Sequence, residues 1–441
     1  MRAIAFTLLF ILAEAATAST TVTLLHFSDY HSHALPFYSE GKEQQGGIAR
    51  TIGYLKRQKK QGALVFSGGD MMNKGAPAWS DKYGCAEWPW LNGVIDAMAF
   101  GNHDADYGFE AFTRCKSAVR YPILSANAHG FPPYAVLVAR GKRIGVFALA
   151  GPDFPALVNG PELRFRDRIE AARSVVRMLR GKEHVDAVVM IGHEHAAADD
   201  ELVRAVAGID VIFGTHSHLK QELKRIEGTT TWFISPFQYM TYISRVEMTF
   251  GNDGLQSVTG SLVPVDSAMP VDRMVEKRVA KMRRDLERDP AYTDLFRPFA
   301  TLAKPMSVSD LGNFTVGIMR EAAGADAALS TASSFRGELP EGPLDLETLR
   351  AAMPYDNEIV VADLTAENYT RLLAYARGRD GDSAAYISES PAKKGATVRV
   401  ATTDYLARVA PGYRDFFAGT NLSASGVRIR ANVKSALTLR R

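Results

Sequence analysis

Apolar, strand-like runs alternate with helix-like segments over residues 21–250, and this alternation constrains the fold more than any other feature. Several runs are too continuously apolar to have one face in water, so they indicate interior strands of an α/β protein. Gly141-Lys142, between two apolar runs, predicts a hairpin turn and therefore some antiparallel pairing. Helical spacing is found in Ile48–Gln61 and Arg168–Leu179, and the strand-like runs are Thr21–Phe27, Ala63–Phe66, Val94–Phe100, Tyr121–Leu124, Ile144–Leu149, Val185–Ile191, Asp210–Phe213 and Thr231–Ser235.

The composition is that of a packed globular chain. Apolar residues make up 46% and charged residues 23%, which excludes disorder and a fibrous architecture. A chain of 441 residues is expected to hold two or three domains, at roughly 150 residues each. The net charge of +3 is too small to predict a nucleic-acid polymer or a membrane surface as partner. Beyond the N-terminus, no stretch reaches the ~18 apolar residues of a spanning helix.

The first eighteen residues have the pattern of a secretory signal peptide. Arg2 is the positive charge, residues 3–13 are an apolar run, and Ala16-Thr17-Ala18 places small residues where a signal peptidase reads. A buried N-terminal strand or helix is the alternative. We expect cleavage after Ala18 and a periplasmic or secreted mature chain.

Two cysteines exclude a disulfide-framework fold and a cysteine-based zinc module. In an oxidising compartment Cys85 and Cys115 could pair and close a loop of 31 residues (115 − 85 + 1). Two free, buried thiols are the alternative, and the sequence leaves both open.

An amphipathic helix is expected over Val271–Arg288, between Pro270 and Pro290, as a connection between two domains. From about residue 300, short strands, helices and turns begin again over a length sufficient for a separate core. The arginine-rich end, 428–441, is expected to be a frayed tail. The apolar face of the helix consists of Val271, Met274, Val275, Val279, Met282 and Leu286.

Potential metal ligands follow five of the strand-like runs, at the point where each run ends. Open α/β sheets place their ligand sites at such strand ends. A neighbouring glycine allows close approach, and Asp-x-His or His-x-His puts two donors on the same side of an extended segment. The donors are Asp29 and His31, then Asp70, then Asn102, His103 and Asp106, then His193, and finally His216 and His218.

Each of these donors alone would more often be a cap, a turn residue or a core histidine. Five successive segments with the same arrangement make chance agreement remote, so we infer a metal site. The other histidines do not share the pattern: His26, His129, His184 and His195 are interpreted as structural, and His33 is left undecided.

These motifs together resemble the signature of calcineurin-like dinuclear metallophosphoesterases. Gly-Asn-His-x-x-Asp at 101–106, Leu-Ser-Ala-Asn at 124–127 and a second domain narrow the resemblance to the bacterial 5′-nucleotidase / UDP-sugar hydrolase family. The resemblance implies an α/β fold: a four-layer α/β/β/α sandwich followed by a smaller α/β substrate-binding domain. Its implied segments are a signal peptide over 1–18, the metallophosphoesterase domain over 19–263, a linker helix over 264–299 and the 5′-nucleotidase C-terminal domain over 300–435.

The resemblance also implies two divalent metal ions. His103 would contact the phosphoryl group and be oriented by Asp106, while hydroxide formed between the metals attacks phosphorus. Mixed carboxylate and imidazole donors suit Zn, Mn, Co or Fe without choosing among them. The first metal would be held by Asp29, His31, Asp70 and His218, and the second by Asp70, Asn102, His193 and His216.

In the second domain the resemblance assigns substrate contacts to Arg336, Tyr355 and Asn357. Arginine is a bidentate phosphate donor, and tyrosine offers a ring face to a base. A core tyrosine is the alternative for Tyr355. The family's upstream phosphate-binding arginines and its glycine-rich C-terminal stretch have no clear match here, so Tyr413 or Phe416 is only a candidate for the second face of a base pocket.

The expected function is an exported two-metal phosphoester hydrolase that removes the 5′-phosphate of nucleotides and also cleaves UDP-sugars. One alternative is a 2′,3′-cyclic nucleotide phosphodiesterase or a thiosulfohydrolase-like relative with the same metals. A second is a nucleotide-binding protein that retains the metals without catalysis. We expect a small-molecule phosphoester or nucleotide as partner, no nucleic-acid polymer and no membrane span; the sequence does not give the oligomeric state.

Overall fold

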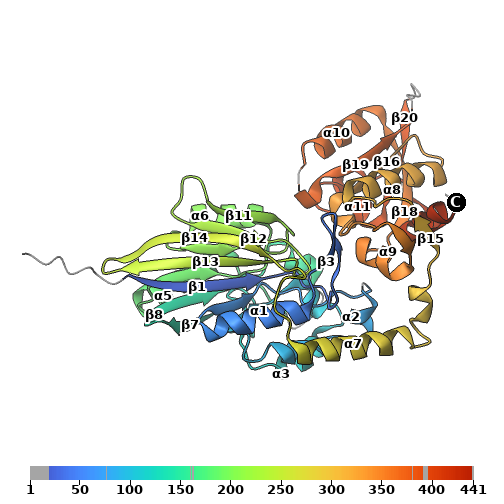
Figure 1. Ribbon diagram of the computed structural model, residues 1–441. Coiled ribbons are helices and arrows are strands. Elements are labelled where there is room, and N and C mark those ends of the chain that lie inside the picture. Colours follow the sequence, from blue (N-terminus) through green and yellow to red (C-terminus); the bar gives the residue numbers. More distant parts are fainter. Residues whose placement is uncertain are drawn as a thin grey trace, which may run out of the picture.

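The computed structural model describes residues 19–75, 77–158, 160, 163–379, 381–390 and 396–439. The expected signal peptide lies outside these residues. Figure 1 shows two parts side by side, a larger one built from the N-terminal half and a smaller one built from the C-terminal third.

A six-stranded sheet contains the first strands of the chain. Its centre is parallel from β1 through β4 and β5 to β6, while β13 and β14 continue it as an antiparallel pair beside β1. The order is β14 (Gly254–Pro264), β13 (Tyr242–Gly251), β1 (Thr20–Phe27), β4 (Leu64–Ser67), β5 (Ala97–Ala99) and β6 (Ile123–Leu124).

A second six-stranded sheet is parallel from β8 through β9 and β10 to β12, with an antiparallel strand at each edge. The predicted hairpin joins β7 to β8, but its turn is Arg140-Gly141 and Lys142 already belongs to β8; both turn residues have positive φ, as a type I′ turn requires. The order is β11 (Lys220–Arg225), β12 (Trp232–Pro236), β10 (Val211–Phe213), β9 (Ala187–Met190), β8 (Lys142–Phe147) and β7 (Tyr134–Ala139).

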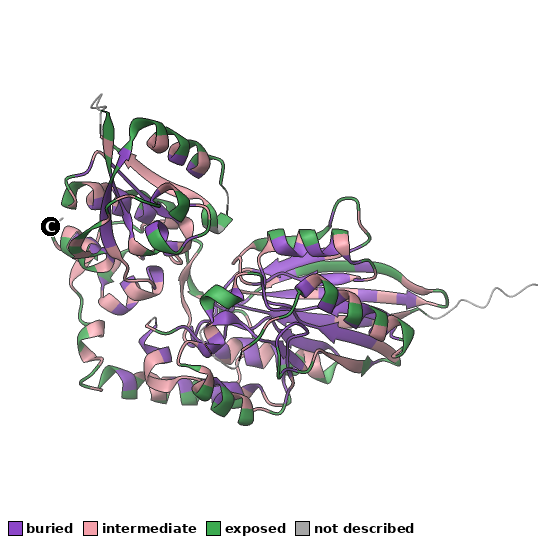
Figure 2. Cartoon of the chain, turned by 180° about the vertical axis from the view of Figure 1, so that it is seen from behind, coloured by how far each residue is buried: buried purple, intermediate pink, exposed green. Residues whose placement is uncertain are grey.

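The two sheets pack face to face, because alternate residues of their strands enter one shared core. Leu24 and Phe66 of the first sheet and Val189 and Phe213 of the second belong to it. Figure 2 shows this burial along the strands. Helices cover both outer faces, and the predicted α/β/β/α sandwich is confirmed. The first sheet is covered by α1 (Ile48–Lys60), α2 (Ala78–Tyr83), α3 (Phe109–Ser117) and α7 (Arg273–Glu287), and the second by α5 (Arg168–Gly181) and α6 (Ala196–Ala205); α4 (Phe154–Leu157) is a single turn.

The smaller part is a five-stranded sheet with helices on both faces. One face packs against α8 (Val308–Ala322), α9 (Leu346–Ala352) and α12 (Ile429–Thr438), and the other against α10 (Ala366–Arg377) and α11 (Asp404–Arg408). The strand order is β19 (Ala385–Glu389), β16 (Ala327–Thr331), β20 (Thr397–Thr403), β18 (Glu358–Thr365) and β21 (Ser423–Arg428). Two short strands, β15 (Ala300–Leu302) and β17 (Gly342–Leu344), form a separate ribbon.

The amphipathic helix expected over 271–288 is present as α7, but Met274 does not lie on its buried face: α7 packs against α1 and α2 and leaves Met274 65% exposed. The expectation for the C-terminal segment is wrong. The expected frayed tail contains α12, which buries Ile429, Val433 and Leu437 in the core beside α8. Because 428–441 is rich in arginine, the four-residue spacing of Ile429, Val433 and Leu437 was not recognised as a helix face.

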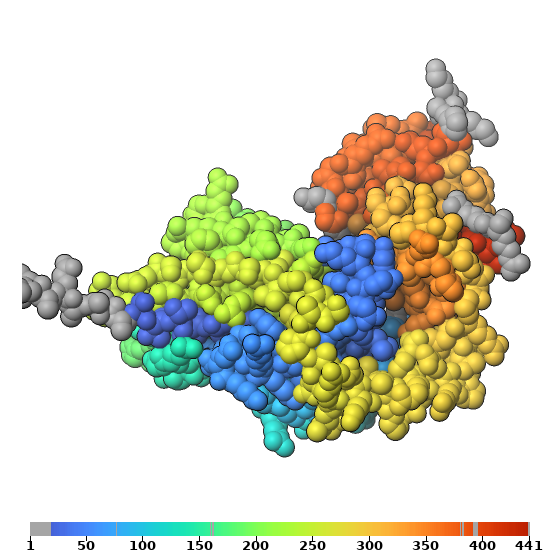
Figure 3. All heavy atoms as spheres, in the orientation of Figure 1, coloured from blue at the N-terminus to red at the C-terminus, as the bar shows by residue number. Residues whose placement is uncertain are grey.

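A hairpin of β2 (Phe37–Ser39) and β3 (Lys42–Gln45) extends from the larger part to the smaller one. At its turn the backbone N–H of Gly41 donates to the Glu338 carboxylate at 2.9 Å. Figure 3 shows this blue segment lying against the orange surface of the second part.

Cys85 and Cys115 form a disulfide, with their Cα atoms 5.9 Å apart. The bond joins the loop after α2 to α3, two elements on the outer face of the first sheet. Of the two alternatives that the sequence left open, the structure shows the paired one.

We predict that Cys115→Ser lowers the free energy of unfolding by about 3–4 kcal/mol, because the bond removes the closure entropy of a 31-residue loop from the unfolded chain. Urea denaturation of the variant and of the parent protein measures this. The reductant dithiothreitol should lower the stability of the parent to that of the variant and leave the variant unchanged. Equal stability of the oxidised parent and the variant would contradict the prediction.

Candidate metal centre

The predicted ligand segments converge at one end of the sandwich. Because β1, β4 and β5 are parallel in one sheet, and β9 and β10 in the other, their carboxyl ends lie at the same edge of each sheet. This edge faces the smaller part of the molecule (Figure 1). The site therefore receives side chains from both sheets and is closed over by the second domain.

The backbone at these strand ends is sharply turned. Five of the seven expected ligands have φ in the left-handed region, which non-glycine residues adopt uncommonly and which concentrates at functional sites. The turns are packed tightly: a Cβ on Gly101 would lie 2.2 Å from the backbone nitrogen of Asp70. The five residues are Asp29, His31, Asp70, His216 and His218.

One group of ligands surrounds the side chain of Asp29. Nε2 of His31 lies 3.1 Å from Nε2 of His218, and Nε2 of His218 lies 3.3 Å from an Asp29 carboxylate oxygen. Two ligands of one tetrahedral ion, each about 2.1 Å from it, would be about 3.4 Å apart. Nδ1 of His31 lies 3.1 Å from the Met72 carbonyl, an acceptor that fixes the proton on Nδ1 and leaves Nε2 to bind an ion.

A second group shares Asp70. Nε2 of His193 lies 3.1 Å from Asp70 Oδ2, and Nδ1 of His193 lies 2.7 Å from the Gly68 carbonyl. Among the described residues, Asp70 Oδ2, His193 Nε2 and Asn102 Oδ1 are buried without a hydrogen-bond partner of acceptable geometry. Buried polar atoms are costly when unpaired, so this donor set fits a cation that binds all three.

The electrostatics of the pocket favour the metal-binding forms of Asp70 and His31 but not that of His193. Burial alone would raise the pKa of Asp70, but His193, His103 and His31 hold it well below its usual range. Burial lowers the pKa of His31 well below its usual value, which keeps that imidazole neutral and able to ligate. Against the effect of burial, Asp70 raises the pKa of His193 to about 9.

Asp153 and His195 belong to this centre, although the sequence analysis did not assign them to it. Nε2 of His216 lies 2.8 Å from Asp153 Oδ2, and His195 Nε2 lies 3.4 Å from the same oxygen. Asp153 follows the run Ile144–Leu149, and β8 lies beside β9, so the strand-end rule applied to this run would have found it. His195 follows His193 with the same His-x-His spacing as His216 and His218.

His103 lies at the edge of the centre, on a 3₁₀ turn (Asn102–Ala105). Its backbone N–H donates to Asp70 at 2.9 Å, and its Nδ1 lies 2.8 Å from the Asp106 carboxylate. Burial lowers its pKa, but Tyr355, Asp106 and Asp70 together raise the pKa of His103 well above its usual value. The hydrogen bond to Asp106 holds the imidazole in one orientation, and these three groups favour its protonated form.

Two of the three residues expected to contact substrate reach this centre from the second domain. Nη1 of Arg336 donates to Nδ1 of His218 at 2.6 Å, and the Tyr355 hydroxyl lies 3.4 Å from Nε2 of His103. Asn357 is half-buried, and its backbone carbonyl accepts from the N–H of Ile429 at the start of α12.

The two candidates for a second base-binding face lie in one hydrophobic cluster of the second domain. Tyr413 is buried in the core beside α10, and its hydroxyl donates to the Ser383 carbonyl at 2.8 Å. Phe416 is half-buried against Tyr375 in the same cluster. Tyr413 is therefore a packing residue in this arrangement.

Among the described residues, no helix is long and apolar enough to cross a bilayer.

The chain matches two known protein families in succession. Residues 22–220 match the calcineurin-like phosphoesterases, and residues 291–436 match the 5′-nucleotidase C-terminal domain. The protein UshA of Yersinia enterocolitica is 24% identical over 89% of this chain and 86% of its own length. The 5′-nucleotidase of Vibrio cholerae is 25% identical over 83% of this chain and 77% of its own.

Solved structures show the same two-domain fold. The 5′-nucleotidase precursor from Thermus thermophilus superposes with a TM-score of 0.78 at 22% identity, covering 95% of this chain and 96% of its own. The sulfate thiohydrolase SoxB from the same organism gives 0.73 at 19% identity, covering 94% of each chain. The chain therefore belongs to the calcineurin-like phosphoesterases that carry a 5′-nucleotidase C-terminal domain, and it is a metal-dependent phosphoester hydrolase.

Proposed function

We propose that this enzyme removes the 5′-phosphate of nucleotides, with UDP-sugars as a second substrate class. The observation that carries the proposal is the arrangement at the domain junction: a carboxylate–imidazole cluster around Asp70, with His103 at its edge and Arg336 and Tyr355 facing it from the second domain. The relatives named 5′-nucleotidase support the same substrate class.

Asp70 bridges the two groups of ligands in this proposal. Asp29, His31 and His218 complete the first metal site, and Asn102, His193 and His216 complete the second. Two divalent ions held there supply charge neutralisation for the phosphoryl oxygens and activate a water molecule. Because Asp153 accepts from Nε2 of His216, Nδ1 is the nitrogen available to the second ion.

His103 holds a proton near the position of the leaving oxygen. Asp106 accepts from Nδ1 of His103, so that Nε2 points toward the substrate. An imidazolium in this place stabilises negative charge in the transition state and can protonate the leaving group. Asp106 acts through His103 and is a positioning residue.

We further propose that residues 300–435 form the substrate-binding unit and that the chain is exported. Tyr355 would stack on the base, Asn357 would hydrogen-bond beside it, and Arg336 would bind a phosphate oxygen. A neutral imidazole has one acceptor nitrogen, so His218 cannot accept from Arg336 at Nδ1 and bind a metal at Nε2 together. His218 would therefore give up this hydrogen bond on binding a metal at Nε2, and Nη1 of Arg336 would then donate to a phosphate oxygen.

We predict that chelation abolishes phosphoesterase activity and that Mn, Co or Zn restores it. Asp70→Asn should lower the bound metal below one ion per chain, because it removes the charge that both ions share. Asp153→Asn should weaken only the second site, by about 10- to 100-fold in affinity, since it removes the carboxylate behind His216. Metal analysis of the purified variants measures both effects.

Asp200→Asn is the matched control for these substitutions, because Asp200 lies on α6 and pairs with Arg204 at the surface. It should retain both ions. Activity that survives exhaustive chelation, in protein shown to contain no metal, would overturn the two-metal assignment. Full occupancy in Asp153→Asn would show that His216 needs no orienting carboxylate.

We predict that His103→Ala retains both ions and lowers kcat by a factor on the order of 10²–10⁴, the usual contribution of a positioned acid or charge stabiliser. Asp106→Asn should lower kcat less, because it affects only the orientation of His103. Steady-state kinetics and metal analysis on the same preparations test this. Loss of metal from His103→Ala would instead make His103 a ligand.

We predict that Tyr355→Ala raises KM for AMP by about 5- to 150-fold, which corresponds to the ~1–3 kcal/mol of base–aromatic stacking. Tyr355→Phe keeps the ring and should keep the KM for AMP. Glycerol phosphate, which has no base, should hardly distinguish Tyr355→Ala from the parent. Equal losses on both substrates would make Tyr355 a packing residue or a partner of His103.

A panel of AMP, UDP-glucose, 2′,3′-cyclic nucleotides, thiosulfate-type substrates and sugar phosphates then ranks the substrates. A preference for a cyclic nucleotide or a thiosulfate-type substrate would replace the nucleotidase proposal by one of the alternatives. No turnover of any of them by fully metal-loaded protein would favour a binding protein.

A further inference from the structure

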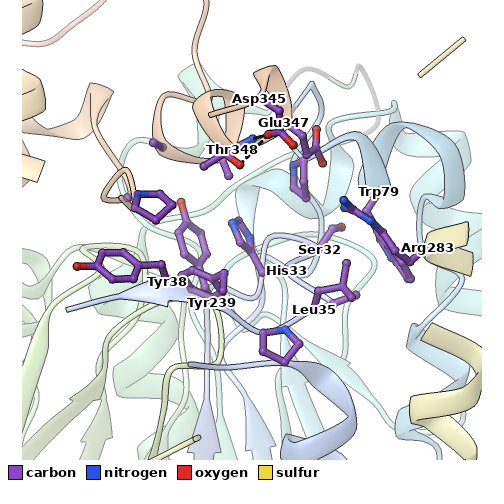
Figure 4. Close-up of a pocket in the computed structure, with 18 of the residues that line it drawn as sticks. Ser32, His33, Leu35, Tyr38, Trp79, Tyr239, Arg283, Asp345, Glu347 and Thr348 are labelled. Atoms are coloured by element: carbon purple, nitrogen blue, oxygen red, sulfur yellow. Dashed lines mark hydrogen bonds between the residues drawn. The ribbon is translucent and has the colours of Figure 1, made fainter. Parts of the chain in front are cut away.

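A cavity of about 290 Å³ lies between the two domains (Figure 4), and none of the seven expected metal ligands lines it. The first domain contributes the segment after His31, from Ser32 to Tyr38, together with Trp79 and Tyr239. The second domain contributes Gly337, Glu338 and Pro340 together with one face of α9. Its volume is near the lower end of the range for small-molecule sites.

Much of the wall is aromatic or apolar. The imidazole of His33 stacks on the ring of Tyr239, with centroids 3.6 Å apart and planes inclined by 16°. Phe37 and Trp79 add further aromatic surface, and Leu286 of α7 and Ala351 of α9 add aliphatic surface. Such a wall favours a ligand with a flat or aliphatic apolar body.

The charged groups around the cavity are mostly acidic. Four carboxylates line it, those of Glu43, Glu338, Asp345 and Glu347, against one guanidinium, that of Arg283. The guanidinium is already paired, since its Nε donates to Glu287 at 2.6 Å. A phosphate dianion would be repelled here, so this cavity does not extend the phosphoester site.

Glu347 is a lining carboxylate whose hydrogen bonding is incomplete. It is only 9% exposed; one carboxylate oxygen accepts from the N–H of Ala78 at 2.9 Å, and the other has no hydrogen-bond partner among the described residues. Burial raises the pKa of Glu347, although Arg350 and Arg283 favour its charged form. Burying an ionised carboxylate is costly, and a ligand in the cavity that donates a charged hydrogen bond to this group offsets part of that cost.

We propose that this cavity binds a small organic ammonium ion, with its apolar body against the His33–Tyr239 stack and its charged N–H group bonded to Glu347. Aromatic faces beside a carboxylate are a favourable environment for an ammonium group. Because both domains line the cavity, such a ligand holds them in the arrangement shown. The site needs neither metal ion and is independent of the phosphohydrolase assignment.

Isothermal titration calorimetry with phenethylamine as probe tests the proposal. The parent protein should bind phenethylamine, and 3-phenylpropionate, which has a similar body with a negative charge, should not bind. Glu347→Gln keeps an oxygen for the Ala78 N–H but loses the charge, and should weaken binding at least about 10-fold. Glu110→Gln, at an exposed glutamate on α3, is the charge-matched control and should bind as the parent does.

Two further binding measurements, on a cavity-filling variant and on chelator-treated protein, complete the test. Ala351→Phe fills the cavity and should abolish binding, which covers the case in which Glu347→Gln fails to fold. Protein treated with a chelator should bind phenethylamine as before, because the amine does not ligate the metals in this proposal. Absent binding by the parent, equal binding by folded Glu347→Gln, binding of the propionate, or loss of binding on chelation would each overturn it.

Discussion

The constraint on which the site depends is a carboxylate that has almost no contact with water. Asp70 is 1% exposed, and an isolated ion in such a place would cost several kcal/mol even after relaxation. The fold meets that cost by surrounding Asp70 with imidazoles and with the backbone N–H of His103. Strands of two different sheets must end at one place to achieve this, so the sandwich architecture and the chemistry depend on each other.

The sequence predicted the local part of this arrangement well. Parallel strands align their carboxyl ends, so donors placed at run ends could be located before any contact was known. The same rule missed Asp153 only because the turn after Ile144–Leu149 carries one acid and no histidine. His195 follows His193 at His-x-His spacing, but spacing alone does not show that Asp153 lies between its ring and that of His216.

Long-range contacts could not be predicted in the same way. The contacts from Tyr355 to His103 and from Arg336 to His218 join residues more than a hundred positions apart, and they depend on how the domains meet. Helix α12 was missed because the four arginines of 428–441 drew attention away from three apolar residues that are buried only through tertiary packing. The pairing of Cys85 and Cys115 likewise depends on the distance between α3 and the loop after α2.

The left-handed backbone at the ligand positions restricts which residues can replace them. Aspartate, asparagine and histidine adopt this conformation more readily than other non-glycine residues, and two of the three also bind metals strongly. A β-branched residue at Asp29, Asp70 or His216 would add backbone strain to the lost ligand. Substitutions at these positions are therefore expected to be limited to aspartate, asparagine, histidine and glycine. A relative whose centre no longer binds metals would still have the same backbone turns at the ligand positions.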